Sequence, residues 1–287
     1  AHAVARGQLA YYRELERLGE VRVIATREDL RDHAAAVEGG DEGEPGAVGV
    51  MLTLEGADPI VEPGRLRAWH TLGLRTLMPA HFGQSRYAAG TPSEDPSHPH
   101  DVDGPLTDRG RALLREMERL AMPLDVTHLS DRSLDEAMES FGGVVYSSHS
   151  GCRSIAAVSR NHTDAQLRAI VESARGAGGV RGVIGVPMCN LFLEPGYGED
   201  NPNHEPRPVS MDRVVDHLLH ICGIAGDAEH AAIGSDLDGG FGLEHAPAGL
   251  NSIADLGPRL GEAMTTRGFS DAHVRAVLWG NWLRFFT

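Results

Sequence analysis

Six short, strongly apolar runs alternate with longer amphipathic segments along most of the 287-residue chain. The runs cover residues 48–54, 74–80, 124–127, 144–148, 183–188 and 231–235. Apolar runs of this length, bounded by turn residues, are typical of parallel strands that are covered on both faces. The segments between them follow helical spacing, so the sequence predicts an α/β architecture with a parallel sheet.

Cap residues mark where several of the helices between these runs begin. Thr107 and Thr163 are good N-caps, and each is followed by apolar residues at helical spacing. Further helices are expected from Ser130 or Asp131 onward, over 214–224 and over 271–285. No internal repeat or linker divides the chain, so we expect one domain.

The composition excludes several classes of function. All 26 basic residues are arginines, because the chain contains no lysine. Walker-type phosphate loops, Schiff bases and carbamylated-lysine metal bridges are therefore excluded. The formal net charge of −15 argues against nucleic acid as a partner. No run reaches the ~20 apolar residues that cross a bilayer, so no membrane span is expected.

The cysteines and serines give little support to a nucleophilic mechanism. Three widely spaced cysteines form neither a disulfide framework nor a zinc knuckle. This pattern favours a reducing compartment, so we expect a cytoplasmic, bacterial protein. Cys152 is close in sequence to His149, but a lone cysteine is more often a small buried hydrophobe. The serines beside His149 lack a Gly-x-Ser-x-Gly elbow, so a serine nucleophile is not expected.

Side chains that bind metals or transfer protons follow five of the six apolar runs. They are Glu55, His81, His128, His149 and Asp236. In a (β/α)₈ barrel the carboxyl ends of the strands form the catalytic face, so residues at these positions converge although they are far apart in sequence. A single strand-end histidine is usually only a solvated or hydrogen-bonded loop residue. Five such residues at the same relative position predict a shared site.

The residue types at these positions suit metal-dependent hydrolysis. Imidazoles and carboxylates are the usual ligands of catalytic zinc, and the carboxylate of Glu55 can bridge two metals ~3.5–4 Å apart. Asp236 can bind a metal, take a proton from an attacking water molecule, or both. His81 can donate a hydrogen bond to a developing oxyanion. Arg160 can clamp a substrate carboxylate or form a surface ion pair, and its spacing leaves both roles open.

Four segments carry these residues in a characteristic order. They are Leu54-Glu55-Gly56, Asp125-Val126-Thr127-His128-Leu129-Ser130, Ser148-His149-Ser150 and Gly234-Ser235-Asp236-Leu237-Asp238-Gly239. In this order they resemble the signature segments of the membrane (renal) dipeptidase family, zinc metallopeptidases of the amidohydrolase-like superfamily. Arg160-Asn161, Gly280-Asn281-Trp282-Leu283-Arg284 and the 21-residue separation of His128 and His149 also match. The resemblance covers roughly residue 45 to the C-terminus and implies a TIM-type (β/α)₈ barrel.

The resemblance also implies the metal ligands. Glu55 bridges two zinc ions, and His128 and His149 complete the ligands of the second ion. Asp236 is a ligand of the first ion and the proton acceptor, chosen over Asp238 because it matches the family pattern. Two Zn²⁺ ions are therefore the expected cofactors.

The implied reaction is zinc-dependent hydrolysis of a dipeptide-like substrate with a free carboxylate. Hydroxide held between the two zinc ions attacks the peptide carbonyl, His81 stabilises the tetrahedral intermediate, and Asp236 delivers a proton to the leaving amine. Arg160 binds the terminal carboxylate of the substrate. The family accepts varied dipeptides, some with a D-residue at the carboxyl end. Barrels of this kind commonly dimerise, so a homodimer is one expected assembly.

One departure concerns the first metal. The family's first barrel strand carries a His-x-Asp pair that supplies two further ligands, and no such strand-end pair precedes Glu55 here. We therefore expect residues 1–287 to form a single metal-dependent hydrolase barrel domain that is N-terminally incomplete, without its first strand or strands. A barrel without these strands exposes unpaired edges, so we expect the missing residues to exist in the natural protein. The first metal site is expected to be incomplete or empty in the chain as given.

Two other functions stay open from the sequence. An amidohydrolase that acts on another small amide or lactam would use the same metals. A metal-poor, non-catalytic relative would instead serve in binding or assembly. Metal content and turnover of dipeptides distinguish the three functions.

Overall fold

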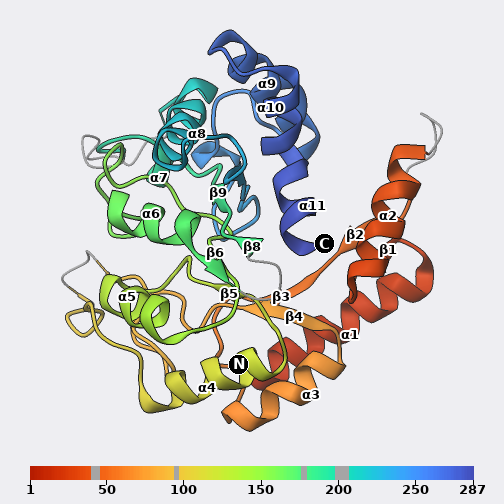
Figure 1. Ribbon diagram of the computed structural model, residues 1–287, viewed down its shortest axis with the longest axis vertical. Helices are drawn as coiled ribbons and strands as arrows, with labels where there is room; N and C mark the ends of the chain where they lie inside the picture. Colours follow the sequence, from red (N-terminus) through yellow and green to blue (C-terminus); the bar gives the residue numbers. More distant parts are fainter. Residues whose placement is uncertain (40–45, 94–96, 176–179, 198–206) are drawn as a thin grey trace. The chain divides into compact units, whose positions relative to one another are not determined.

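The computed structural model describes residues 1–39, 46–93, 97–175, 180–197 and 207–287. The chain divides into an N-terminal unit, Ala1–Gly143 with Phe286–Thr287, and a C-terminal unit, Val144–Phe285. Each unit combines short parallel strands with helices that pack on them (Figure 1). That residues 1–287 act as one domain stays a prediction.

The N-terminal unit places three parallel strands side by side. Its elements are α1 (His2–Leu18), β1 (Val21–Val23), α2 (Arg27–Gly39), β2 (Val48–Val50), β3 (Leu52–Leu54), the 3₁₀ turn η1 (Pro63–Arg65), α3 (Leu66–Thr71), β4 (Leu74–Leu77), α4 (Asp108–Arg119), β5 (Leu124–Asp125) and α5 (Asp131–Ser140). β1 pairs in parallel with β2, and β4 pairs in parallel with both β3 and β5. The carboxyl ends of β3, β4 and β5 therefore lie at one edge of their sheet.

Helix α4 shows how the sequence builds the core of this unit. Its N-cap, Thr107, accepts a hydrogen bond from the backbone N–H of Gly110 at 3.0 Å, as its position predicts. Leu113, Leu114 and Met117 lie on one face of the helix and are buried. In contrast, neither α1 nor α2 contains a buried residue.

The C-terminal unit repeats the alternation of strand and helix. Its elements are β6 (Val145–Tyr146), α6 (Asp164–Glu172), β7 (Ala174–Arg175), β8 (Val180–Arg181), β9 (Ile184–Val186), α7 (Asn190–Leu193), α8 (Met211–Ala225), β10 (Ala231–Ile233), the 3₁₀ turn η2 (Leu243–His245), α9 (Ile253–Thr266), α10 (Asp271–Arg275), the π-helical turn η3 (Ala276–Gly280) and α11 (Asn281–Phe286). β9 and β10 are parallel, and Ser147, just after β6, forms a parallel bridge with Ile184. β7 and β8 form a separate antiparallel pair.

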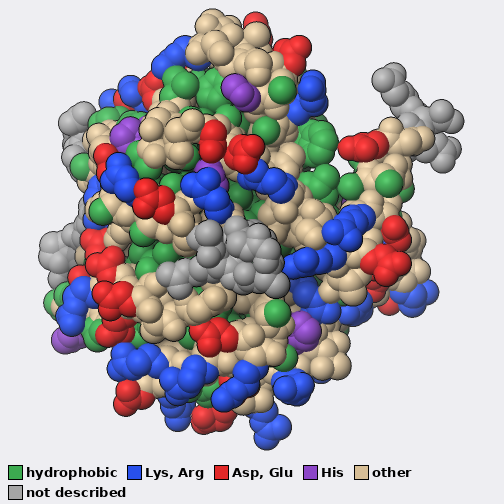
Figure 2. Space-filling view, viewed as in Figure 1, with side chains coloured by type: hydrophobic (Ala, Val, Ile, Leu, Met, Phe, Trp, Pro, Cys, Tyr) green, Lys and Arg blue, Asp and Glu red, His purple; other side chains and the backbone are tan. Residues whose placement is uncertain are grey.

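The predicted α/β class is confirmed. Each of the six predicted runs contains a strand, and the expected helices after Thr107, Ser130 and Thr163 are present. The closed (β/α)₈ barrel stays a prediction. Among the described residues, no helix has both the length and the hydropathy of a membrane span. Figure 2 shows acidic side chains and arginines intermixed on the visible face.

Candidate functional site

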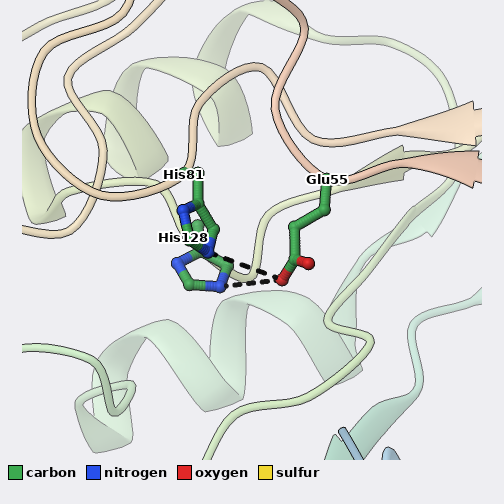
Figure 3. A group of neighbouring side chains, drawn as sticks. All are labelled: Glu55, His81 and His128. Atoms are coloured by element: carbon green, nitrogen blue, oxygen red, sulfur yellow. Dashed lines mark ion pairs between the residues drawn. The ribbon is translucent and has the colours of Figure 1, made fainter. Parts of the chain in front are cut away.

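The first group of candidate residues follows three neighbouring strands of the N-terminal unit. Glu55 comes directly after β3, His81 after β4 and His128 after β5. Because these parallel strands are adjacent, their carboxyl ends bring the three side chains together. Figure 3 shows both imidazole rings turned toward the carboxylate of Glu55.

The donor atoms of this group have the spacing that a shared metal ion requires. Nε2 of His128 lies 3.1 Å from Oε1 of Glu55, and Nε2 of His81 lies 3.8 Å from the same oxygen. Two donors that each lie about 2.1 Å from a tetrahedral zinc ion are roughly 3.4 Å apart. One ligand atom from each residue lies within 4.8 Å of the other two. This set of nitrogen and oxygen donors therefore fits a divalent cation such as zinc.

The turn after β5 fixes the position of His128. Oδ1 of buried Asp125 accepts hydrogen bonds from the backbone N–H of Thr127 at 3.1 Å and from its hydroxyl at 2.5 Å. An aspartate that bonds the backbone two residues on stabilises a tight turn. His128 is buried, and the rings of His81 and Phe82 pack against it at centroid distances of 4.2 and 5.1 Å. No sequence pattern marks Phe82, which lies half exposed beside both histidines.

The second group lies in the C-terminal unit, where His149 follows β6 and Asp236 follows β10. Nε2 of His149 is 3.9 Å from Oδ2 of Asp236, close to the spacing of two ligands of one ion. Asp236 has a φ of 54°, in the left-handed region that aspartate tolerates better than most residues. The backbone N–H of Gly239 donates to the carbonyl of Asp236 at 2.9 Å and closes the turn.

Two glycines hold the segment that carries His149. A Cβ atom at Gly185 would lie 2.0 Å from the carbonyl oxygen of Ser148, and one at Gly234 would lie 1.7 Å from it. No real side chain fits at these distances, so β9 and the residue that follows β10 can approach this carbonyl only as glycines. The backbone N–H of Ser150 also donates to the carbonyl of Gly185 at 2.8 Å. The residues on either side of His149 are thus fixed by backbone contacts.

Arg160 is buried beside His149 rather than lying at the surface, with 3% of its area exposed. Its guanidinium donates to the carbonyl of His149, and its Cζ lies 5.3 Å from the ring centroid of Phe192. Both contacts lie within the C-terminal unit and hold the arginine next to a candidate ligand. The surface ion pair that the sequence left open does not fit this burial.

The cysteines behave as buried structural residues. Cys152 is fully buried, and burial raises the pKa of its thiol, with the charge of Asp164 acting in the same direction. Burial also raises the pKa of Cys189 to about 11, and the carboxylate of Asp236 adds to this shift. Both residues are therefore neutral thiols near pH 7, which is the wrong state for a nucleophile.

Within each unit, the predicted metal-binding residues of that unit lie close together. Glu55, His81 and His128 lie together in the N-terminal unit, and His149 and Asp236 lie together in the C-terminal unit. That both groups serve a single metal centre stays a prediction.

Comparison with known proteins adds an independent result. A family model described as membrane dipeptidase, peptidase family M19, matches residues 7–287. An uncharacterized protein in the pqqA 5′ region of Klebsiella pneumoniae is 30% identical over 243 residues, which are 84% of this chain and 82% of that protein. A dipeptidase of Claviceps purpurea, tcpJ, is 28% identical over 82% of this chain and 50% of its own length. The chain thus spans about half the length of that curated dipeptidase.

A solved structure agrees with these matches. A metallopeptidase from Rhodobacter sphaeroides, in complex with a phosphinate mimic of the dipeptide L-Ala-D-Ala, superposes with a TM-score of 0.79 at 28% identity. The match covers 98% of this chain and 72% of that one. The sequence family and the fold therefore point to the same group of proteins.

Proposed function

Because the chain belongs to the membrane dipeptidase family, peptidase family M19, we propose that it hydrolyses dipeptides with the help of bound divalent metal ions. The observation that carries this proposal is the approach of two histidines to Glu55. Nε2 of His128, a proposed ligand, lies 3.1 Å from Oε1 of Glu55, and Nε2 of His81, the proposed hydrogen-bond donor to the substrate, lies 3.8 Å from the same oxygen. We propose that residues 1–287 act in this reaction as one hydrolase domain.

Zinc is the proposed metal, with two ions in the centre. Glu55, His128, His149 and Asp236 are the proposed ligands, because strand ends present their nitrogen and oxygen donors at ligand-like spacing. When bound, the cations would lower the pKa of a water molecule and polarise the substrate carbonyl. Glu55 is partly exposed, and its carboxylate would supply an oxygen ligand to the bound metal.

The remaining chemistry belongs to the side chains. Asp236 takes a proton from the water that adds to the carbonyl carbon, and returns it to the amine nitrogen as the C–N bond breaks. His81, also half exposed, donates a hydrogen bond to the carbonyl oxygen while negative charge develops there. Arg160 binds the terminal carboxylate of the dipeptide, which selects substrates with a free carboxyl end.

The replacement His149→Ala tests this proposal. The variant should lose at least about 100-fold in hydrolysis of L-Ala-D-Ala by the zinc-loaded chain, because loss of a ligand costs more than loss of a residue that supports one. Liberated amine measures turnover, mass spectrometry measures bound zinc, and circular dichroism checks the fold. His273→Ala, which removes an exposed histidine of the same unit, is the control and should keep parental turnover.

Other outcomes separate the alternatives. Full turnover by His149→Ala would refute the ligand assignment. Turnover of other amides or lactams, but of no dipeptide, would indicate a different amidohydrolase. A chain that neither binds zinc nor turns over any amide would be a non-catalytic relative. Zinc content also tests His81, because His81→Ala should lower turnover and keep the metal if His81 only binds the carbonyl oxygen.

A further inference from the structure

We propose that Thr91 and Ser148 are positioning residues, whose hydroxyl groups hold the Nδ1 atoms of His128 and His149 so that each Nε2 faces the metal-binding carboxylate of its own unit. This inference rests on the proposed function, since it takes both histidines as metal ligands. Ser148 belongs to a segment in which a serine nucleophile was not expected, and Thr91 lies in a loop that no motif marked.

In the N-terminal unit the two nitrogens of His128 have separate partners. Nε2 lies 3.1 Å from Oε1 of Glu55, and Nδ1 lies 3.3 Å from Oγ1 of Thr91. The Thr91 hydroxyl also lies 3.3 Å from the backbone carbonyl of His128 and can donate to it. Because the hydroxyl proton goes to that carbonyl, the oxygen is left to accept a hydrogen bond from Nδ1–H.

Thr91 is placed for this role by backbone pairing. Its side chain is buried, its N–H donates to the carbonyl of His81 at 3.0 Å, and its carbonyl accepts from the N–H of Gly83 at 2.9 Å. The loop that carries Thr91 is thus tied to the segment that carries His81. The hydroxyl therefore stands at a fixed point beside His128.

The C-terminal unit repeats the arrangement with different residues. Nε2 of His149 lies 3.9 Å from Oδ2 of Asp236, and Nδ1 lies 2.7 Å from Oγ of Ser148. The backbone of Ser148 is held by its close contacts with Gly185 and Gly234. In both units a hydroxyl thus contacts Nδ1 while a carboxylate faces Nε2.

The chemistry of imidazole explains why this matters. A neutral histidine that binds a metal through Nε2 carries its proton on Nδ1. A partner that accepts a hydrogen bond from Nδ1–H fixes both the tautomer and the orientation of the ring, and its removal typically weakens metal binding about 10–100-fold.

The test compares the zinc affinity of full-length variants by competition with a chelating dye, starting from metal-free protein. Thr91→Val and Ser148→Ala should each bind zinc about 10–100-fold more weakly than the parent. Thr91→Ser and Ser148→Thr keep the hydroxyl and should stay within about threefold of the parent. If Thr91→Val does not fold, Thr91→Ala removes the same hydroxyl without replacing its volume.

Two matched controls remove buried hydroxyls elsewhere. Ser147→Ala breaks a 2.9 Å contact between Oγ of Ser147 and Nε2 of His162, a histidine outside both groups. Thr76→Val removes a hydroxyl that donates to the carbonyl of Pro123 at 2.9 Å. Both controls should bind zinc as the parent does.

Three results would overturn the inference. If Thr91→Val and Ser148→Ala bound zinc as tightly as the parent, the two hydroxyls would have no positioning role, and the proposed function would still stand. If Ser147→Ala and Thr76→Val lost as much zinc affinity, the loss of any buried hydroxyl would weaken zinc binding, and Thr91 and Ser148 would have no specific role. A parent chain that binds no zinc would overturn both this inference and the proposed function.

Discussion

At the scale of single residues, Gly234 in the C-terminal unit leaves no room for a side chain. The Cβ of an alanine at position 234 would lie 1.7 Å from the carbonyl oxygen of Ser148, so β10 would have to move away. We expect Gly234→Ala to lower the free energy of unfolding by about 3 kcal/mol, as forced overpacking does. Urea unfolding followed by circular dichroism measures the change.

Gly223 provides the matched control for this substitution. It lies in α8, and a Cβ there would meet no atom within 4 Å beyond its chain neighbours and the backbone of its own helix. Alanine there removes glycine's entropic cost in a helix and should stabilise the protein by about 0.5–1 kcal/mol. If both variants lost stability equally, close packing would not be the cause at Gly234.

The sequence alone predicts which side chains form the candidate site, but not which residues support them. Glu55, His128 and Asp236 could be picked out because polar side chains after apolar runs are a local pattern. Thr91 could not, because its contact with His128 spans 37 residues and depends on how a loop folds back. The burial of Arg160 beside His149 could not be predicted either. The position of Arg160 in the sequence suits a surface ion pair as well as a buried guanidinium.

At the scale of secondary structure, N-cap residues predicted where helices begin better than residue periodicity predicted where helices lie. The predicted N-cap Thr163 forms a full capping box with Gln166, and α6 begins at the next residue. Helix α9 was missed because Gly257 and Pro258 lie inside it, and both residues normally signal a break. The expected helix over 271–285 is present but contains the π-helical turn η3, which residue spacing does not reveal.

Helix α8 carries a buried histidine that should make stability depend on pH. Nδ1 of His217 accepts a hydrogen bond from the N–H of Cys152 at 2.9 Å, and Nε2 donates to the carbonyl of Leu193 at 3.0 Å. Burial lowers the pKa of His217 to about 4, whereas an unfolded histidine has a pKa of about 6.5. Between these two pH values the unfolded chain binds more protons, so the free energy of unfolding falls as the pH falls.

The substitution His217→Gln isolates this effect, because glutamine can accept and donate but does not titrate. Between pH 7 and pH 5 the parent should lose about 2 kcal/mol more of its unfolding free energy than the variant. Urea titrations at both pH values measure the difference. His273→Gln, at an exposed position, should keep the parental pH dependence, and equal pH dependence in the parent and His217→Gln would contradict the prediction.

At the scale of the whole molecule, metal binding should stabilise the fold. A ligand that binds only the folded state adds about 2.7 kcal/mol at a free concentration 100 times its Kd. We therefore expect zinc to raise the melting temperature of the metal-free chain, and a chelator to reverse the increase. Differential scanning calorimetry measures the shift, and identical melting with and without zinc would contradict a metal site in the folded chain.

The larger-scale organisation was the least accessible to sequence reasoning. The α/β class followed from alternating apolar runs, but the closure of a barrel depends on strand pairs that no local pattern specifies. β5 and β6 are only two residues long, so their apolar runs overstate the hydrogen-bonded strands. The homodimer also stays a prediction, because an interface leaves no periodic signal in a single chain.

The left-handed backbone of Asp236 determines which replacements can report on its carboxylate. Alanine at a φ of 54° carries a strain of roughly 1–2 kcal/mol, so an inactive alanine variant would confuse a distorted turn with a missing anion. Asparagine tolerates the same conformation and is nearly isosteric with aspartate. Asp236→Asn therefore removes the negative charge and keeps the conformation of the turn. A loss of activity in this variant reports on the carboxylate and not on a distorted backbone.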